Sequence, residues 1–113
     1  MKLVALQRLW YDRLTLEKVF YSFDIQSIIT TREVSELRQL LETEELAYVF
    51  IDEEWQDDIT LLQTVYALQP KAKIILTIAR GAEIPSVPST MIDNVFVLCK
   101  PYTEEKMKKL LQF

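Results

Sequence analysis

The chain has 113 residues, of which 50% are hydrophobic and 27% charged, with a net charge of −4. This length and composition predict one globular domain spanning 1–113 that buries a core without metal or disulfide support. The acidic balance argues against direct nucleic-acid binding, and the absence of histidine argues against a triad hydrolase or a zinc enzyme.

The sequence also indicates a compartment. No apolar run reaches the roughly 18 residues of a membrane span, and Met1-Lys2-Leu3 does not begin a signal peptide. The single cysteine, Cys99, leaves no internal disulfide and suits a reducing environment. We therefore expect a cytoplasmic protein without a membrane segment.

The first third of the chain alternates strand and helix patterns. The apolar run 3–6 predicts a strand, and Asp12 is the expected cap of a helix whose apolar stripe begins at Leu16. Residues 24–31 are interpreted as a second strand. Thr30 and Glu33 have the spacing of a capping box, which predicts a second helix running to about residue 45.

The most hydrophobic stretch follows at 47–52. Its apolar and β-branched residues predict a strand that is covered on both faces and ends at Asp52. An acidic segment comes next, in which Asp57 or Asp58 is the expected cap of a third helix. Gln69-Pro70 ends that helix.

The last third predicts two more strands, at 73–78 and 95–99. Between them, residues 80–94 contain a glycine and two prolines, so any helix there should be short or displaced. After Lys100-Pro101, Thr103 is the expected cap of a final helix with acidic residues first and lysines last. Five alternating strand–helix units predict an α/β fold, a parallel sheet with helices on both faces.

Polar residues close four of the predicted strands: Gln7 and Arg8 the first, Asp52 the third, Thr77 the fourth and Lys100 the fifth. Because the carboxyl ends of parallel strands meet at one edge of a sheet, we expect these residues to converge there.

An Asp, a Thr and a Lys-Pro at the ends of strands three, four and five resemble the receiver domain of bacterial response regulators, over the whole chain. The resemblance implies a flavodoxin-like sheet of order 2-1-3-4-5. It also implies that Asp52 is the phosphoacceptor, that Lys100 pairs with it and that Thr77 reaches the phosphoryl oxygen. An acidic pair after the first strand holds Mg²⁺ in that family, and Gln7 and Arg8 take those positions here.

This departure predicts a degenerate site. Mg²⁺ prefers carboxylate oxygens in octahedral geometry, which an amide and a guanidinium do not supply. The connection after Asp52 is also short and lacks the usual Pro and Asp-Gly. We therefore expect no metal, no cofactor and no modification of Asp52 by acetyl phosphate. Arg8 and Lys100 are both expected to approach Asp52, with Arg8 standing in for the charge of the metal.

The leading interpretation is a non-enzymatic pseudo-receiver that signals through protein contacts. Its partner would be a sensor kinase, an output domain or a second copy bound through the last strand and helix. One alternative is a phosphorylatable receiver with metal held through Asp57 or Glu53. The other is a small flavodoxin-like ligand-binding module, against which the lack of a glycine-rich loop counts.

Overall fold

The computed structural model describes residues 2–25, 27–55 and 57–111. Its sheet is parallel throughout and has the strand order β2-β1-β3-β4-β5, which confirms the prediction. The strands are β1 (Leu3–Leu6), β2 (Ile28–Thr31), β3 (Tyr48–Asp52), β4 (Lys73–Ile78) and β5 (Val95–Cys99).

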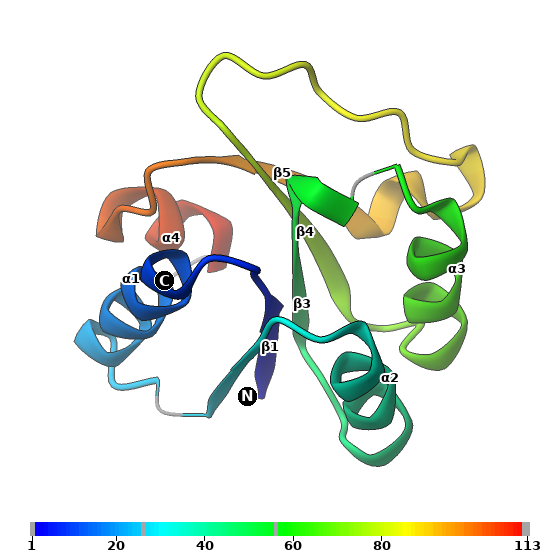
Figure 1. Ribbon diagram of the computed structural model, residues 1–113, viewed down its shortest axis with the longest axis horizontal. Helices are drawn as coiled ribbons and strands as arrows, with labels where there is room; N and C mark the ends of the chain where they lie inside the picture. Colours follow the sequence, from blue (N-terminus) through cyan, green and yellow to red (C-terminus); the bar gives the residue numbers. More distant parts are fainter. Residues whose placement is uncertain (1, 26, 56, 112–113) are drawn as a thin grey trace.

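Helices cover both faces of the sheet, also as predicted. Figure 1 shows α1 and α4 on one face, with α2 and α3 on the other. Two short 3₁₀ helices, η1 and η2, complete the chain. The bounds are α1 (Trp10–Ser22), α2 (Val34–Thr43), η1 (Glu53–Trp55), α3 (Ile59–Leu68), η2 (Ser89–Asn94) and α4 (Glu104–Leu111).

The core consists of two apolar clusters, one on each face of the sheet. Alternation of side chains along β3 sends Val49 and Ile51 to the α2–α3 side, while Tyr48 and Phe50 face α1 and α4. All five residues of β3 are buried, including Asp52. A strand buried on both faces needs a nearly continuous apolar run, which is why 47–52 was the most informative stretch of the sequence.

The second strand is shorter than predicted, because residues 24 and 25 form the turn that ends α1. Asp24 takes a left-handed backbone conformation with φ of 60°, and its amide donates to the Tyr21 carbonyl. Asp is one of the few residues that tolerates this conformation. Ile25 still packs against the α1–α4 cluster, so its hydrophobicity reflects burial in a turn.

Two of the predicted helix caps are wrong. Asp12 lies inside α1, which begins at Trp10. The Thr30–Glu33 capping box does not form, because Thr30 lies in β2 and donates to Glu17, while the Glu33 amide donates to Thr31. Local spacing suggested both caps, but the structure uses these side chains in tertiary contacts.

The other two caps are confirmed. Asp58 accepts a hydrogen bond from the Leu61 amide at 2.9 Å. Thr103 accepts one from the Lys106 amide at 3.2 Å. Each cap satisfies an amide that has no partner within its helix.

The helix in the segment 80–94 is the short 3₁₀ helix η2, in agreement with the prediction that any helix there would be short or displaced. The segment runs without regular structure to Pro88 and then enters η2. Figure 1 shows it arching from the end of β4 toward η2. Within the described residues, no helix is both long and apolar enough to cross a membrane.

Candidate functional site

Asp52 and Thr77 meet at the carboxyl edge of the sheet. They are directly paired in the register of β3 and β4. The Thr77 hydroxyl donates to Oδ1 of Asp52 at 3.1 Å. Asp52 is only 4% exposed and Thr77 is fully buried. The carboxylate is therefore held in a site that is nearly closed to bulk water.

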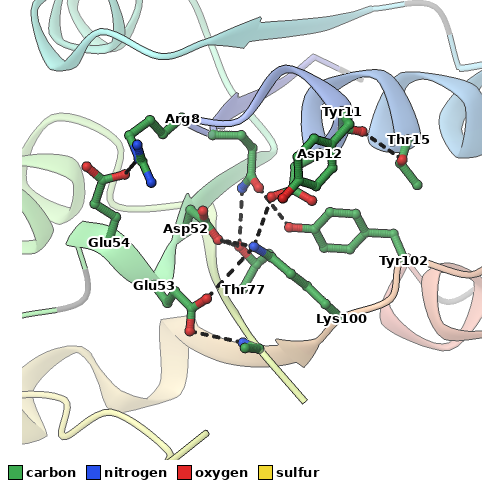
Figure 2. A network of polar contacts seen from close by, with 12 residues as sticks. Arg8, Tyr11, Asp12, Thr15, Asp52, Glu53, Glu54, Thr77, Lys100 and Tyr102 are labelled. Carbon is green, nitrogen blue, oxygen red and sulfur yellow. Dashed lines mark hydrogen bonds and ion pairs between the residues drawn. The ribbon is translucent and has the colours of Figure 1, made fainter.

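Lys100 is the cation that compensates Asp52. It directly follows β5, and its backbone amide donates to the Ile78 carbonyl at 2.8 Å, which extends the sheet by one bond. Its side chain turns back over the strand ends, where Nζ lies 2.9 Å from Oδ1 of Asp52 and 3.0 Å from Oδ2 of Asp12. Figure 2 shows the ammonium group between these carboxylates, with Glu53 beside them.

Asp12 is the site residue that the sequence interpretation missed. The side chains of Asp12, Asp52 and Lys100 retain only 11%, 6% and 19% of their exposure. Within α1, Asp12 falls on the same buried stripe as Leu16 and Val19, at spacings of four and seven residues. A carboxylate on a buried stripe requires a buried partner. The position of Asp12 on this stripe was the feature of the sequence that could have identified it as a site residue.

The charges explain how Lys100 stays protonated in this position. Burial lowers the pKa of the ammonium, but the hydrogen bonds that it donates to Asp52 and Asp12, together with the negative charges of these carboxylates, outweigh this effect, so the pKa of Lys100 is raised. The Glu53 carboxylate adds a third negative group 4.0 Å away. Lys100 is thus a fixed positive charge at neutral pH.

A directed chain of hydrogen bonds reaches Asp52 from the α1–α4 side of the sheet. The Tyr102 hydroxyl donates to Oε1 of Gln7 at 2.7 Å, and Nε2 of Gln7 donates to the Thr77 hydroxyl at 3.2 Å. Thr77 then donates to Asp52. Burial raises the pKa of Tyr102, and nearby carboxylates raise it further, so its hydroxyl keeps the proton that it donates.

No protein-family model matches the sequence, and no curated protein matches it either. Solved structures do match. A CheY-like response regulator receiver domain from Methylobacillus flagellatus has a TM-score of 0.78 at 16% identity, covering 99% of this chain and 96% of that one. The chain has the receiver-domain fold.

Two further receiver-like structures extend the comparison. The BeF3-activated conformation of SdrG from Pseudomonas melonis Fr1 gives a TM-score of 0.74 at 17% identity, covering 98% of this chain and 92% of that one. A CheY-like protein (tadZ) from Pseudomonas aeruginosa PAO1 gives 0.70 at 12% identity, covering 99% and 97%. At identities this low, the structural similarity establishes the fold alone, so the function must be argued from the residues of the site.

Four of the five predicted site residues lie together on this receiver fold: Gln7, Asp52, Thr77 and Lys100. Arg8 does not join them. Its guanidinium pairs with Glu54 at 2.5 Å in an exposed ion pair, and Figure 2 shows the two side chains to one side of the network. The expectation that Arg8 compensates Asp52 is therefore corrected: Lys100 does so, and Asp12 shares the lysine.

The residues at the strand ends do not fit the Mg²⁺ that receiver domains imply. Both functional ends of the Gln7 amide are committed to Tyr102 and Thr77, and Lys100 lies between Asp12 and Asp52. Across residues 2–25, 27–55 and 57–111, no group of three or more Cys, Asp or Glu side chains is placed to hold a metal ion. A hard divalent cation needs several oxygen ligands that are free to turn toward it.

Glu53 and Asp57, the alternative metal ligands, are not placed together as a metal site either. Glu53 accepts a hydrogen bond from the Ala79 amide at 3.1 Å, which ties η1 to the end of β4. Asp57 is exposed in the turn before α3. This part of the chain thus offers no arrangement that replaces the missing acidic pair.

Proposed function

We propose that this protein is a pseudo-receiver, a non-enzymatic signalling module that acts through protein contacts without Mg²⁺-dependent phosphorylation. The observation that carries the proposal is Gln7, which stands with Arg8 in place of the acidic pair and whose amide is bonded to Tyr102 and Thr77. The positive charge at the site is then Lys100, whose ammonium lies within 3.0 Å of both Asp12 and Asp52. The expected cytoplasmic location is part of the proposal.

The hydrogen-bond chain supports the same conclusion. A phosphoryl group arriving at Asp52 needs donors and a cation that are free to neutralise its developing charge. Here the Thr77 hydroxyl donates to Asp52 itself, and the Lys100 ammonium is shared with Asp12. The site is therefore built to hold one protonation and hydrogen-bonding state, and signalling would depend on which partner binds the surface.

The test is intact-mass measurement after incubation with Mg²⁺ and acetyl phosphate. We expect no phosphoryl adduct on the wild-type chain. The matched variant Gln7→Asp/Arg8→Asp restores two carboxylates after β1 and should bind Mg²⁺ more tightly in a calorimetric titration. An adduct on the wild type that disappears in Asp52→Asn would refute the proposal.

A phosphorylatable receiver is the second candidate, because Asp52, Thr77 and Lys100 do converge. In that case Lys100 would have to leave Asp12 to meet the phosphoryl group. The same mass measurement decides between the two candidates, and an adduct at Asp52 would select this one.

A further inference from the structure

A cavity of about 410 Å³ opens beside the polar network, between the first turns of α1 and the segments that follow β4 and β5. Its wall is predominantly apolar and includes Tyr11, Ala79, Pro101 and Tyr102. Figure 2 shows both tyrosines close to Lys100, which also lines the cavity. The volume falls in the range of small-molecule pockets, roughly 300–1,000 Å³. The fold thus has a space of ligand size next to the site.

Arg80 is the arginine of this chain that lacks a partner. The other four are engaged, since Arg8, Arg32 and Arg38 pair with glutamates and Arg13 donates to two backbone carbonyls. Arg80 lines the cavity and is exposed, and within the described part of the chain no oxygen accepts from its guanidinium. A guanidinium is always charged, and its planar fork fits a carboxylate. Its position therefore indicates an anionic ligand.

The charges of the lining determine which end of such a ligand enters the cavity. Asp12 and Lys100, the other charged residues of the lining, pair with each other at 3.0 Å. Because Lys100 is also shared with Asp52, this end of the cavity has an excess of negative charge. A carboxylate would be repelled there and attracted at Arg80, so the apolar part of the ligand would enter. The two tyrosine rings favour an aromatic group.

We propose that this cavity binds a small aromatic carboxylate, whose ring contacts Tyr11 and Pro101 and whose carboxylate is held by Arg80. The sequence has no glycine-rich loop, the usual cradle of a phosphate, which favours a carboxylate as the anionic group. The ligand would cover the Asp12–Lys100 pair. On the proposed function, it would be an input that needs no phosphorylation, although the binding itself does not depend on that function.

The probe is phenylacetate, titrated into the full chain and followed by ¹H–¹⁵N correlation NMR, which locates the binding site and shows whether each variant is folded. 2-Phenylethanol keeps the ring without the charge, and acetate keeps the charge without the ring. Arg80→Gln removes the partner of the carboxylate, and Arg32→Gln removes the same charge at an exposed position beside β2. Tyr11→Ala removes one ring of the wall, and Tyr11→Phe is its matched control.

We expect saturable shifts of the amides that line the cavity, with a Kd of about 1 mM for a ligand of this size. Arg80→Gln and Tyr11→Ala should each bind phenylacetate about fivefold more weakly, whereas Arg32→Gln and Tyr11→Phe should bind it as the wild type does. 2-Phenylethanol and acetate should each bind the wild type about fivefold more weakly than phenylacetate, because each lacks one of the two contacts.

Three outcomes would overturn the inference: no saturable shifts in the cavity, equal binding of 2-phenylethanol and phenylacetate, or equal binding of phenylacetate by Arg80→Gln and Arg32→Gln. The titration uses neither Mg²⁺ nor a phosphodonor. It can therefore fail while the mass measurement supports the proposed function, or succeed while that measurement refutes it.

Discussion

Removing Lys100 should cost far more stability than removing either of its partners. In Lys100→Met the volume of the side chain is largely kept, but Asp12 and Asp52 remain as two buried carboxylates without a cation. Deleting one partner of a buried ion pair costs about 3–5 kcal/mol. Because 19% of the Lys100 side chain stays exposed, we expect the lower end, about 3 kcal/mol.

The two acids should behave differently from the lysine. Asp12→Asn leaves the Lys100–Asp52 pair in place, and Asp52→Asn leaves the Lys100–Asp12 pair. Each should cost only about 1 kcal/mol, the scale of one hydrogen bond. The triple variant Asp12→Asn/Asp52→Asn/Lys100→Met carries no uncompensated charge from this group, so it should recover most of the loss caused by Lys100→Met.

Urea unfolding followed by tryptophan fluorescence gives the free energy of unfolding of all four variants. These free energies are comparable if the variants share the same dependence of that free energy on urea concentration. The reasoning about the site is refuted if Lys100→Met is no less stable than Asp12→Asn. It is also refuted if the triple variant is less stable than Lys100→Met. Either result would mean that the carboxylates do not depend on this lysine.

Three other predictions concern the surroundings of the site. Arg8→Ala should cost less than about 1 kcal/mol, because its pair with Glu54 is exposed, and a double-mutant cycle with Asp52→Ala should give no coupling; a clear coupling energy would contradict the geometry. Tyr102→Phe leaves Oε1 of the buried Gln7 without this donor, so unfolding in urea should show a loss of about 1–3 kcal/mol; an unchanged midpoint would contradict the contact. Folding raises the pKa values of Lys100 and Tyr102, so the stability that these groups contribute is full below their unfolded pKa values of about 10 and is lost as the pH rises beyond them. Urea unfolding at alkaline pH should show this loss, and the loss should be smaller in Lys100→Met. An equal loss in that variant would contradict the prediction.

The parallel sheet and its layers were predictable because β1, β3 and β4 are buried on both faces, whereas the strand order was predicted from the resemblance to receiver domains. Such strands need continuous apolar runs, which are visible in one sequence. For residues 80–94 only the lack of a long helix was predictable, because Gly81, Pro85 and Pro88 interrupt the helical pattern; the path of the segment was not. The end of α1 was not predictable, since Ile25 has the hydrophobicity of a strand residue but packs from a turn.

The site residues that follow strands were predictable from the sequence, whereas Asp12, which lies in a helix, was not. The ends of β3, β4 and β5 placed Asp52, Thr77 and Lys100 together. Asp12 was assigned to a cap because the start of α1 was placed too late. Because α1 begins at Trp10, Asp12 lies inside the helix, on the buried stripe of Leu16 and Val19. Arg8 was expected to approach Asp52 but pairs with Glu54. The choice between these two carboxylates depends on side-chain geometry that residue spacing does not encode.

Because the ammonium of Lys100 is attached to the chain, the positive charge at this site does not depend on the concentration of a free ion. A bound ion is lost to chelators and varies with its free concentration, whereas a group attached to the chain has a high and constant effective concentration at its site. Melting curves recorded in EDTA and in excess Mg²⁺ should therefore superimpose, and separated curves would show a metal dependence. On the proposed function, the charge at this site would stay constant and the binding of a partner would carry the signal.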